Sequence, residues 1–221
     1  MQFHSHDAYL QTCEQEMATK FVAMGADPKS IHCLGGPDAY QQLVDSQDLV
    51  DALYIPLPSA LHKDWVRKAL ESGKHVLLEK PVALAADDFL DMMQAAYECG
   101  KLLMDGTMFV HNNRTQKLLK YCCNEKTMGT IQRIESAFSF NGQEDDPNFF
   151  VNNVRCRIDG DPMGCVGDLG WYCVYMALLV FNAAAGARPV AVKAVDFTST
   201  DDGVPIDASC IVYFEKVRCV G

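Results

Sequence analysis

The chain has 221 residues, of which 49% are hydrophobic, and 29 acidic side chains outnumber 19 basic ones to give a formal net charge of −10. This length is sufficient to bury the core of one or two ordinary domains. Nucleic acid is excluded as an expected partner, because phosphate backbones are bound by clustered lysine and arginine and no basic stripe occurs.

The cysteines and the apolar runs indicate the environment of the protein. Ten cysteines are scattered without a CxxC pair, which favours reduced thiols in a cytoplasmic protein over disulfides or structural zinc, so no metal site is expected. The first residues have neither the positive nor the apolar region of a secretory signal. The longest apolar run, 172–185, contains Asn182 and is shorter than the ~20 residues of a membrane span. We therefore expect no membrane contact.

The chain before residue 51 predicts two helices, at about 7–24 and 38–44, and a short strand at 31–34. Pro37 opens the second helix, where its missing backbone donor costs nothing. No Gly-x-Gly-x-x-Gly turn occurs, although a dinucleotide fold holds the pyrophosphate at such a turn after its first strand. Gly35-Gly36 does not replace it, because this pair directly precedes Pro37 and follows a different strand.

The next stretch carries the clearest pattern, two apolar strands on either side of an amphipathic helix. The first strand, 51–55, ends at Pro56-Leu57-Pro58, because proline lacks the donor that a strand ladder needs. The second strand, 75–78, is a short apolar run, which predicts that both its faces are covered, and it ends in Glu79-Lys80-Pro81. Together they predict a right-handed parallel βαβ unit, and ligands bind at the edge where such strands end.

The remaining elements change character about halfway along the chain. They are a helix at 85–99, a strand at 102–105, a helix at 112–124, a long strand at 129–140, a loop at 143–167, a helix at 168–185 and strands at 190–198 and 208–214. This order predicts an α/β fold class, with an incomplete Rossmann-type dinucleotide-binding domain at 1–106. An α+β domain with a largely antiparallel open sheet follows at 107–221.

Three motifs, in this order and spacing, resemble the glucose-fructose oxidoreductase, inositol dehydrogenase and rhizopine-catabolism (Gfo/Idh/MocA) oxidoreductases. They are Leu57-Pro58-Ser59-Ala60-Leu61-His62, Glu79-Lys80-Pro81 and Asp168-Leu169-Gly170-Trp171-Tyr172. The chain is most similar to the dihydrodiol and D-xylose dehydrogenase branch. The resemblance covers about 19–217 and implies hydride transfer between NADP or NAD and a CH–OH group of a sugar, cyclitol, other polyol or dihydrodiol. It also implies a homodimer or homotetramer for a complete protein.

The resemblance assigns the chemistry to Lys80, Asp168 and Tyr172. Oxidation of an alcohol needs a group that takes the hydroxyl proton, and a cation beside the developing alkoxide lowers the barrier. A nearby ammonium also favours the phenolate form that a tyrosine base requires. Asp168 and Tyr172 lie four residues apart and therefore share one helix face. The alternative interpretations are a solvated lysine, a helix-capping aspartate and a tyrosine that only packs.

Further contacts follow from the same resemblance. It implies that cofactor is bound by Leu57, Pro58, His62, Glu79, Lys80 and Pro81, with His62 near the nicotinamide ribose. It implies substrate contact for His111 and Arg114. Taken alone, a histidine on a helix is more often structural or solvated than a ligand contact.

Compared with that family, the chain lacks the first two strands and ends within the second sheet, so the resemblance implies a truncated protein. Loss of the first strand would leave an apolar edge beside the strand at 51–55. Two functions stay open at this stage. One is an NAD(P)-dependent oxidoreductase, which the retained Lys80, Asp168 and Tyr172 favour. The other is a non-catalytic member that binds or oligomerises through its second domain, which the missing strands favour.

Overall fold

The computed structural model describes residues 19–20, 22–25, 27, 29, 34–46 and 50–215. The predicted helix at 7–24 and strand at 31–34 lie mostly outside these residues. The helix expected at 38–44 is confirmed as α2 (Ala39–Asp45).

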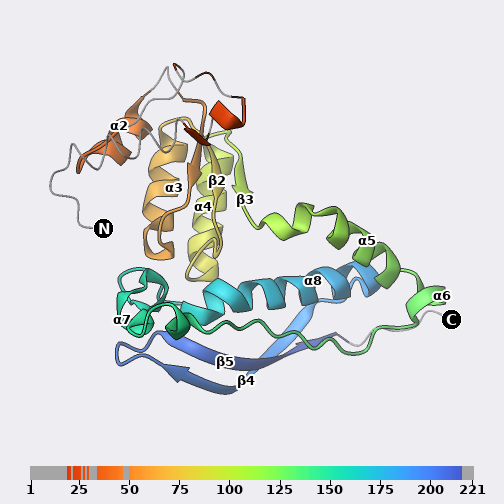
Figure 1. Ribbon diagram of the computed structural model, residues 1–221. Helices are drawn as coiled ribbons and strands as arrows, with labels where there is room; N and C mark the ends of the chain where they lie inside the picture. Colours follow the sequence, from red (N-terminus) through yellow and green to blue (C-terminus); the bar gives the residue numbers. More distant parts are fainter. Residues whose placement is uncertain are drawn as a thin grey trace.

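Three parallel strands form the first sheet, in the order β1 (Ala52–Ile55), β2 (His75–Leu78) and β3 (Leu103–Asp105). Helix α3 (His62–Glu71), preceded by the 3₁₀ turn η2 (Ser59–Leu61), joins β1 to β2, and α4 (Ala86–Glu98) joins β2 to β3 (Figure 1). The predicted βαβ unit is therefore confirmed, and the chain enters each loop after a strand at the same edge of the sheet.

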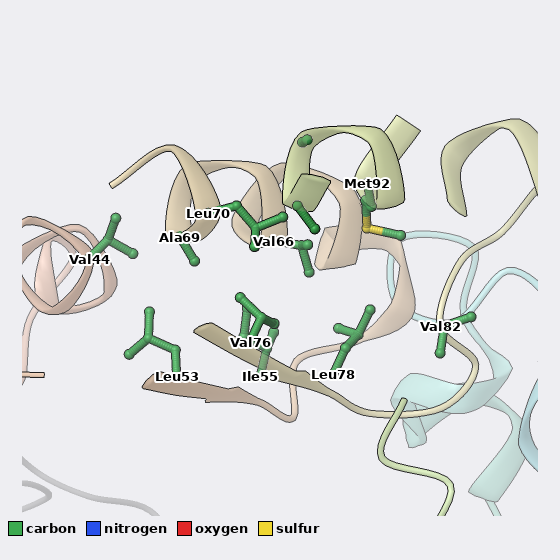
Figure 2. Close-up of a cluster of buried hydrophobic side chains, with 12 residues drawn as sticks. Val44, Leu53, Ile55, Val66, Ala69, Leu70, Val76, Leu78, Val82 and Met92 are labelled. Carbon is green, nitrogen blue, oxygen red and sulfur yellow. The ribbon is translucent and has the colours of Figure 1, made fainter. Parts of the chain in front are cut away.

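The core of this half lies between one face of the sheet and its helices, as Figure 2 shows. Alternate residues of the strands point toward the helices, because successive side chains of a strand face opposite sides. The buried side chains include Leu53, Ile55, Val76 and Leu78 from the strands, Val66, Ala69 and Leu70 from α3, and Met92 from α4.

The opposite face of the sheet is open within the described part of the chain. Leu77 is 37% exposed, and its neighbours Tyr54 and Met104 are 55% and 49% exposed. The prediction that the strand at 75–78 is covered on both faces is therefore wrong for the described residues. An apolar run shows that the side chains are suited to burial, but not that both faces of the strand are covered. Here α2, α3 and α4 all pack on one side of the sheet.

The long strand predicted at 129–140 is also wrong. After β3 the chain forms the 3₁₀ turn η3 (Met108–His111) and the helices α5 (Asn113–Cys122) and α6 (Glu125–Met128), and residues 129–141 then run without regular structure. Alternating apolar residues can form the buried face of a strand, but the backbone N–H and C=O groups of a strand also need a neighbouring strand to hydrogen-bond with. In the described residues β4 and β5 pair only with each other, so no ladder reaches this segment.

The loop predicted at 143–167 contains three short helical turns, η4 (Gly142–Glu144), α7 (Phe149–Asn152) and η5 (Val154–Cys156). A π-helical turn, η6 (Val166–Gly170), then leads into α8 (Trp171–Ala185). The helix predicted from residue 168 is thus present, but its first turn is wider than an α-helix.

The antiparallel pair β4 (Pro189–Ser199) and β5 (Pro205–Phe214) completes the described chain and confirms the two predicted strands. Figure 1 shows α8 lying along this hairpin, and the rings of Phe181 and Phe214 stack with centroids 4.2 Å apart. One helical stretch, Val166–Ala184, is long and apolar enough to cross a membrane by length and composition. This stretch contacts α5 and the hairpin, and 17% of it is buried within the described structure.

Candidate active site

The two halves of the chain meet at Lys80, directly after β2. Its Nζ donates to the carboxylate Oδ1 of Asp168 at 2.5 Å and to the backbone oxygen of Asp168 at 2.9 Å. The two side chains are only 12% and 16% exposed, so solvent screens this pair weakly. The Lys80-Pro81 peptide bond is cis. An ion pair that forms across 88 residues of sequence brings the edge of the sheet to the start of α8.

Tyr172 lies beside this pair. The Nζ of Lys80 is 5.1 Å from the centroid of the Tyr172 ring, which is the range of a cation–π contact. Phe109 and Phe138 each flank that ring with centroids at 5.9 Å. The three side chains expected at the reacting centre therefore converge, although Lys80 contacts the ring of Tyr172 and no hydrogen bond to its hydroxyl is recorded.

The close approach of the two halves depends on a glycine in the π-helical turn. A Cβ on Gly167 would lie 2.8 Å from the Cβ of Met163 and 3.0 Å from the Cγ of Pro81. Only a residue without a side chain lets Pro81 pack against the turn, and the next residue in the chain is Asp168. This local requirement brings the Asp168 carboxylate within reach of Lys80.

Sequence reasoning missed Arg155, a second cation at this carboxylate. Its Nε lies 3.1 Å from Oδ1 of Asp168, while its own side chain is 50% exposed. The side chain of Asn153 accepts a hydrogen bond from the backbone nitrogen of Arg155 and so starts the turn η5. The Asn-x-Arg spacing is the signal for this turn, within a segment that the composition predicts to be a loop. Two cations around one carboxylate leave the cluster with a net positive charge.

Cys156 neighbours this cluster without the character of a nucleophile. Burial raises the pKa of its thiol, and the charge of Asp168 raises it further. A thiol that holds its proton is a poor nucleophile and metal ligand. Among the described residues, no three His, Cys, Asp or Glu side chains are grouped so that they could hold a metal ion.

A polar network supports the site from β3. The indole nitrogen of Trp171 donates to Oγ1 of Thr107 at 2.8 Å. The hydroxyl of Thr107 in turn donates to Asp105 at 2.5 Å, and its backbone nitrogen donates to the same oxygen at 2.8 Å. Sequence analysis assigned no role to Thr107 or Trp171, although they connect the end of β3 to the first turn of α8.

The loop that carries Arg155 also contacts the segment after Pro58. Oδ1 of Asp161 accepts a hydrogen bond from the backbone nitrogen of Ser59 at 2.7 Å, and the carbonyl of Gly160 accepts one from Ala60 at 3.0 Å. A Cβ on Gly160 would lie 2.4 Å from the carbonyl oxygen of Val154, so this turn requires glycine. The position of Arg155 is therefore fixed by neighbours on both sides.

Glu79 is engaged by a neighbouring strand. Its Oε1 accepts a hydrogen bond from the hydroxyl of Tyr54 at 2.6 Å, and its Oε2 accepts one from the backbone nitrogen of Lys80 at 3.1 Å. The hydrogen bond to Glu79 raises the pKa of Tyr54 to about 12. Glu79 thus orders the loop after β2.

His62 is 1% exposed, and both its ring nitrogens face backbone carbonyl oxygens. No nitrogen of this ring is left for a ligand. Leu57 and Pro58, by contrast, are partly exposed after β1, and Lys80 is partly exposed after β2. Together with Glu79 and Pro81, they form the carboxyl edge of the sheet.

His111 and Arg114 lie apart from this cluster. Both are exposed, on η3 and on the first turn of α5, and the backbone nitrogen of Arg114 is bound by Asn112 as a helix cap. No contact recorded for the described residues joins either one to Lys80 or Asp168. His111 lines an open hollow of about 440 Å³ beside β3, together with Asp105, Thr107, Val110 and Tyr175.

Comparison with known proteins identifies the family of the chain. Residues 5–107 match the model of the oxidoreductase family with an NAD-binding Rossmann fold, GFO_IDH_MocA. The chain is 30% identical over 193 residues to a dTDP-3,4-didehydro-2,6-dideoxy-alpha-D-glucose 3-reductase of Streptomyces violaceoruber, covering 83% of this chain and 54% of the relative. It is 32% identical to D-xylose 1-dehydrogenase (NADP(+)) 2 of Haloferax volcanii, covering 83% and 53%.

Among solved structures, a 3-ketoreductase of Actinomadura kijaniata in complex with NADP and TDP-benzene matches with a TM-score of 0.54 at 30% identity, covering 69% of this chain and 44% of that one. The protein therefore belongs to the Gfo/Idh/MocA family of oxidoreductases. It spans about half the length of the curated relatives it matches.

Proposed function

We propose that the protein is an NAD(P)-dependent oxidoreductase that transfers a hydride between the nicotinamide and a CH–OH group of a sugar, cyclitol or dihydrodiol. The observation that carries this proposal is the convergence of Lys80, Asp168 and Tyr172 at the carboxyl edge of the parallel sheet. The named relatives, which act on a dTDP-sugar and on D-xylose, support the substrate class.

The residues of the chain have separable tasks in this reaction. Lys80 places an ammonium beside the substrate oxygen and stabilises the negative charge that develops there. Asp168 holds that ammonium in place, and Tyr172, in its phenolate form, takes the hydroxyl proton on its oxygen in the direction of oxidation and becomes the neutral phenol. A bound nicotinamide would supply the hydride acceptor. Phe109 and Phe138 pack against the Tyr172 ring and restrict its position.

The carboxyl edge fits the nicotinamide end of such a cofactor, either NADP or NAD. Leu57, Pro58, Glu79, Lys80 and Pro81 would hold it, because they follow β1 and β2 where ligands of open α/β sheets bind. His62 would affect cofactor binding indirectly, because its ring contacts the carbonyl oxygens of Leu57 and Pro81 in the loops after β1 and β2. We propose His111 and Arg114 as outer substrate contacts, since both are exposed and His111 lines the hollow beside Thr107. A glycine-rich cradle for the pyrophosphate does not occur among the described residues.

Domain organisation and assembly complete the proposal. We propose a cofactor domain at 1–106 and a substrate domain at 107–221 whose hairpin, exposed on β4, pairs with a second copy in a dimer or tetramer. A cytoplasmic location fits the seven free cysteines of the described residues. A non-catalytic role is the second candidate, favoured by the open face of the first sheet.

Turnover of the wild type and of K80M tests the function. NADP⁺ reduction is followed with D-xylose, scyllo-inositol and a dihydrodiol, alongside fluorescence titration with NADPH. We expect K80M to lose turnover by at least about a hundredfold while its fold is retained. K63M is the matched control, since Lys63 lies on the surface of α3 and pairs with Asp88. Turnover of K80M equal to the wild type would remove Lys80 from the mechanism, and absence of NADPH binding would favour the non-catalytic role.

A further inference from the structure

His62 occupies an unusual position for a family-motif histidine, since it is buried between two loops. It belongs to the first turn of α3 and is 1% exposed. Its Nε2 lies 2.8 Å from the carbonyl oxygen of Leu57, in the loop after β1. Its Nδ1 lies 2.9 Å from the carbonyl oxygen of Pro81, in the loop after β2.

The chemistry of these two partners restricts the state of the ring. A carbonyl oxygen only accepts hydrogen bonds, so each contact requires a nitrogen that carries hydrogen. A neutral imidazole has one such nitrogen, and its other nitrogen would turn a lone pair toward an oxygen less than 3 Å away. An imidazolium donates from both nitrogens. Burial of its charge is costly, but two carbonyl dipoles aimed at the ring offset part of that cost.

We propose that His62 is a positioning residue whose ring, carrying hydrogen on both nitrogens, ties the loop after β1 to the loop after β2 and so holds Lys80 against Asp168. This inference deepens the function proposed above, because it rests on the placement of Lys80, but its test needs no turnover.

The route from His62 to Lys80 is short. Pro81 is held on its carbonyl by His62, and its ring packs on the π-helical turn at Gly167. Lys80 directly precedes Pro81, and its side chain, 12% exposed, reaches Asp168. Fixing Pro81 on two sides therefore restricts the backbone from which Lys80 extends.

The reactivity of Lys80 reports this placement without cofactor. Acetylation of each lysine is measured by peptide mass spectrometry in the wild type, in H62F, which keeps a ring but has no donor, and in two controls. H75F removes a histidine that contacts only the backbone nitrogen of Leu102. L70A destabilises the same helix by creating a cavity at a fully buried residue. Lys74, 2% exposed, serves as the internal reference for opening of the whole domain.

We expect H62F to raise the acetylation rate of Lys80 relative to that of Lys74 by about tenfold, because the loop after β2 opens locally. H75F and L70A should leave that ratio within about twofold. An unchanged ratio in folded H62F, or an equal rise in L70A, would overturn the positioning role. Absence of turnover in the wild type, together with the expected rise at Lys80 in H62F, would count against the proposed function alone.

Nitrogen NMR of the wild type, labelled at histidine, decides the protonation state even where H62F does not fold. We expect both ring nitrogens of His62 to show the shifts of nitrogens that carry hydrogen, in the buffer of the acetylation experiment, because each faces a carbonyl oxygen. The pattern of a neutral ring, with one protonated and one bare nitrogen, would overturn the proposal.

Discussion

A single carboxylate, that of Asp168, organises the site at the scale of residues. It receives Lys80 from the edge of the sheet and Arg155 from the loop before α8. An aspartate with only one cation would be neutralised as a pair, whereas two cations leave one positive charge for a substrate oxygen. In the reaction proposed above, Arg155 would therefore act through its charge at Asp168.

Replacement of Arg155 by glutamine tests the electrostatic role of Arg155. We expect R155Q to lower kcat/KM by about tenfold, since the net positive charge beside the alkoxide is lost. R155Q should lower the free energy of unfolding by less than about 1 kcal/mol, because the side chain is half exposed and ion pairs at the surface contribute little to stability. R157Q is the matched control on the same turn, where Arg157 pairs only with Asp159. Equal effects of R155Q and R157Q on kcat/KM would contradict the assignment.

The hydrogen bond from Tyr54 to Glu79 gives a prediction on pH. It raises the pKa of Tyr54 to about 12 from the usual 10.0. Because the folded value lies above the unfolded one, the stabilising contribution is complete below pH 10.0 and is lost as pH rises toward 12. The difference in phenolate absorbance between wild type and Y54F should therefore titrate near the higher value. A midpoint at the ordinary tyrosine value would show that the hydrogen bond to Glu79 is absent.

At the scale of elements, the π-helical turn η6 is tightly packed at one of its two glycines. Gly167 is pressed between Met163 and Pro81, whereas a Cβ on Gly170, three residues on, would meet nothing closer than 3.6 Å. We expect G167A to lower the free energy of unfolding by about 1–3 kcal/mol through overpacking. G170A should be neutral or stabilising by up to about 1 kcal/mol, because alanine favours helix. Denaturant unfolding measures both, and equal values for the two variants would contradict this account.

The elements that could be predicted from sequence are those whose signal is local. Pro56 and Pro58 end a strand and Gly73 follows a helix, so the βαβ unit needed no tertiary information. The prediction of a strand at 129–140 was wrong because apolar alternation does not provide a partner strand. Lys80 and Asp168 were placed together by family resemblance, whereas Arg155 became visible only once the loop had folded back onto Asp168.

At the scale of the whole molecule, three of the contacts between the two halves start from the carboxyl side of a strand, one for each strand of the first sheet. Ser59 after β1 binds Asp161, Lys80 after β2 binds Asp168, and Thr107 after β3 binds Trp171. The site therefore lies at the junction of the two proposed domains, where Figure 1 shows the sheet half meeting the start of α8. A substrate bound at this junction would contact both domains.

The exposed hairpin gives a prediction for assembly. Val192 and Phe197 on β4 are 68% and 65% exposed, which is large for apolar side chains on one strand. If a second copy covers them, V192E with F197E should shift the complete protein toward monomer in light scattering, since burying charge is costly. K193E is the control, because it changes charge on the same strand without removing apolar surface. Unchanged mass in the double variant would exclude this hairpin as the interface.

The most direct test of the central claim is a double-mutant cycle on single-turnover hydride transfer, using K80M, D168N and the combined variant. If the two side chains act as one unit at the reacting oxygen, the combined variant should lose about as much rate as K80M alone, a coupling of about 1 kcal/mol or more. Rate losses that simply add, or wild-type rates in both single variants, would contradict the account.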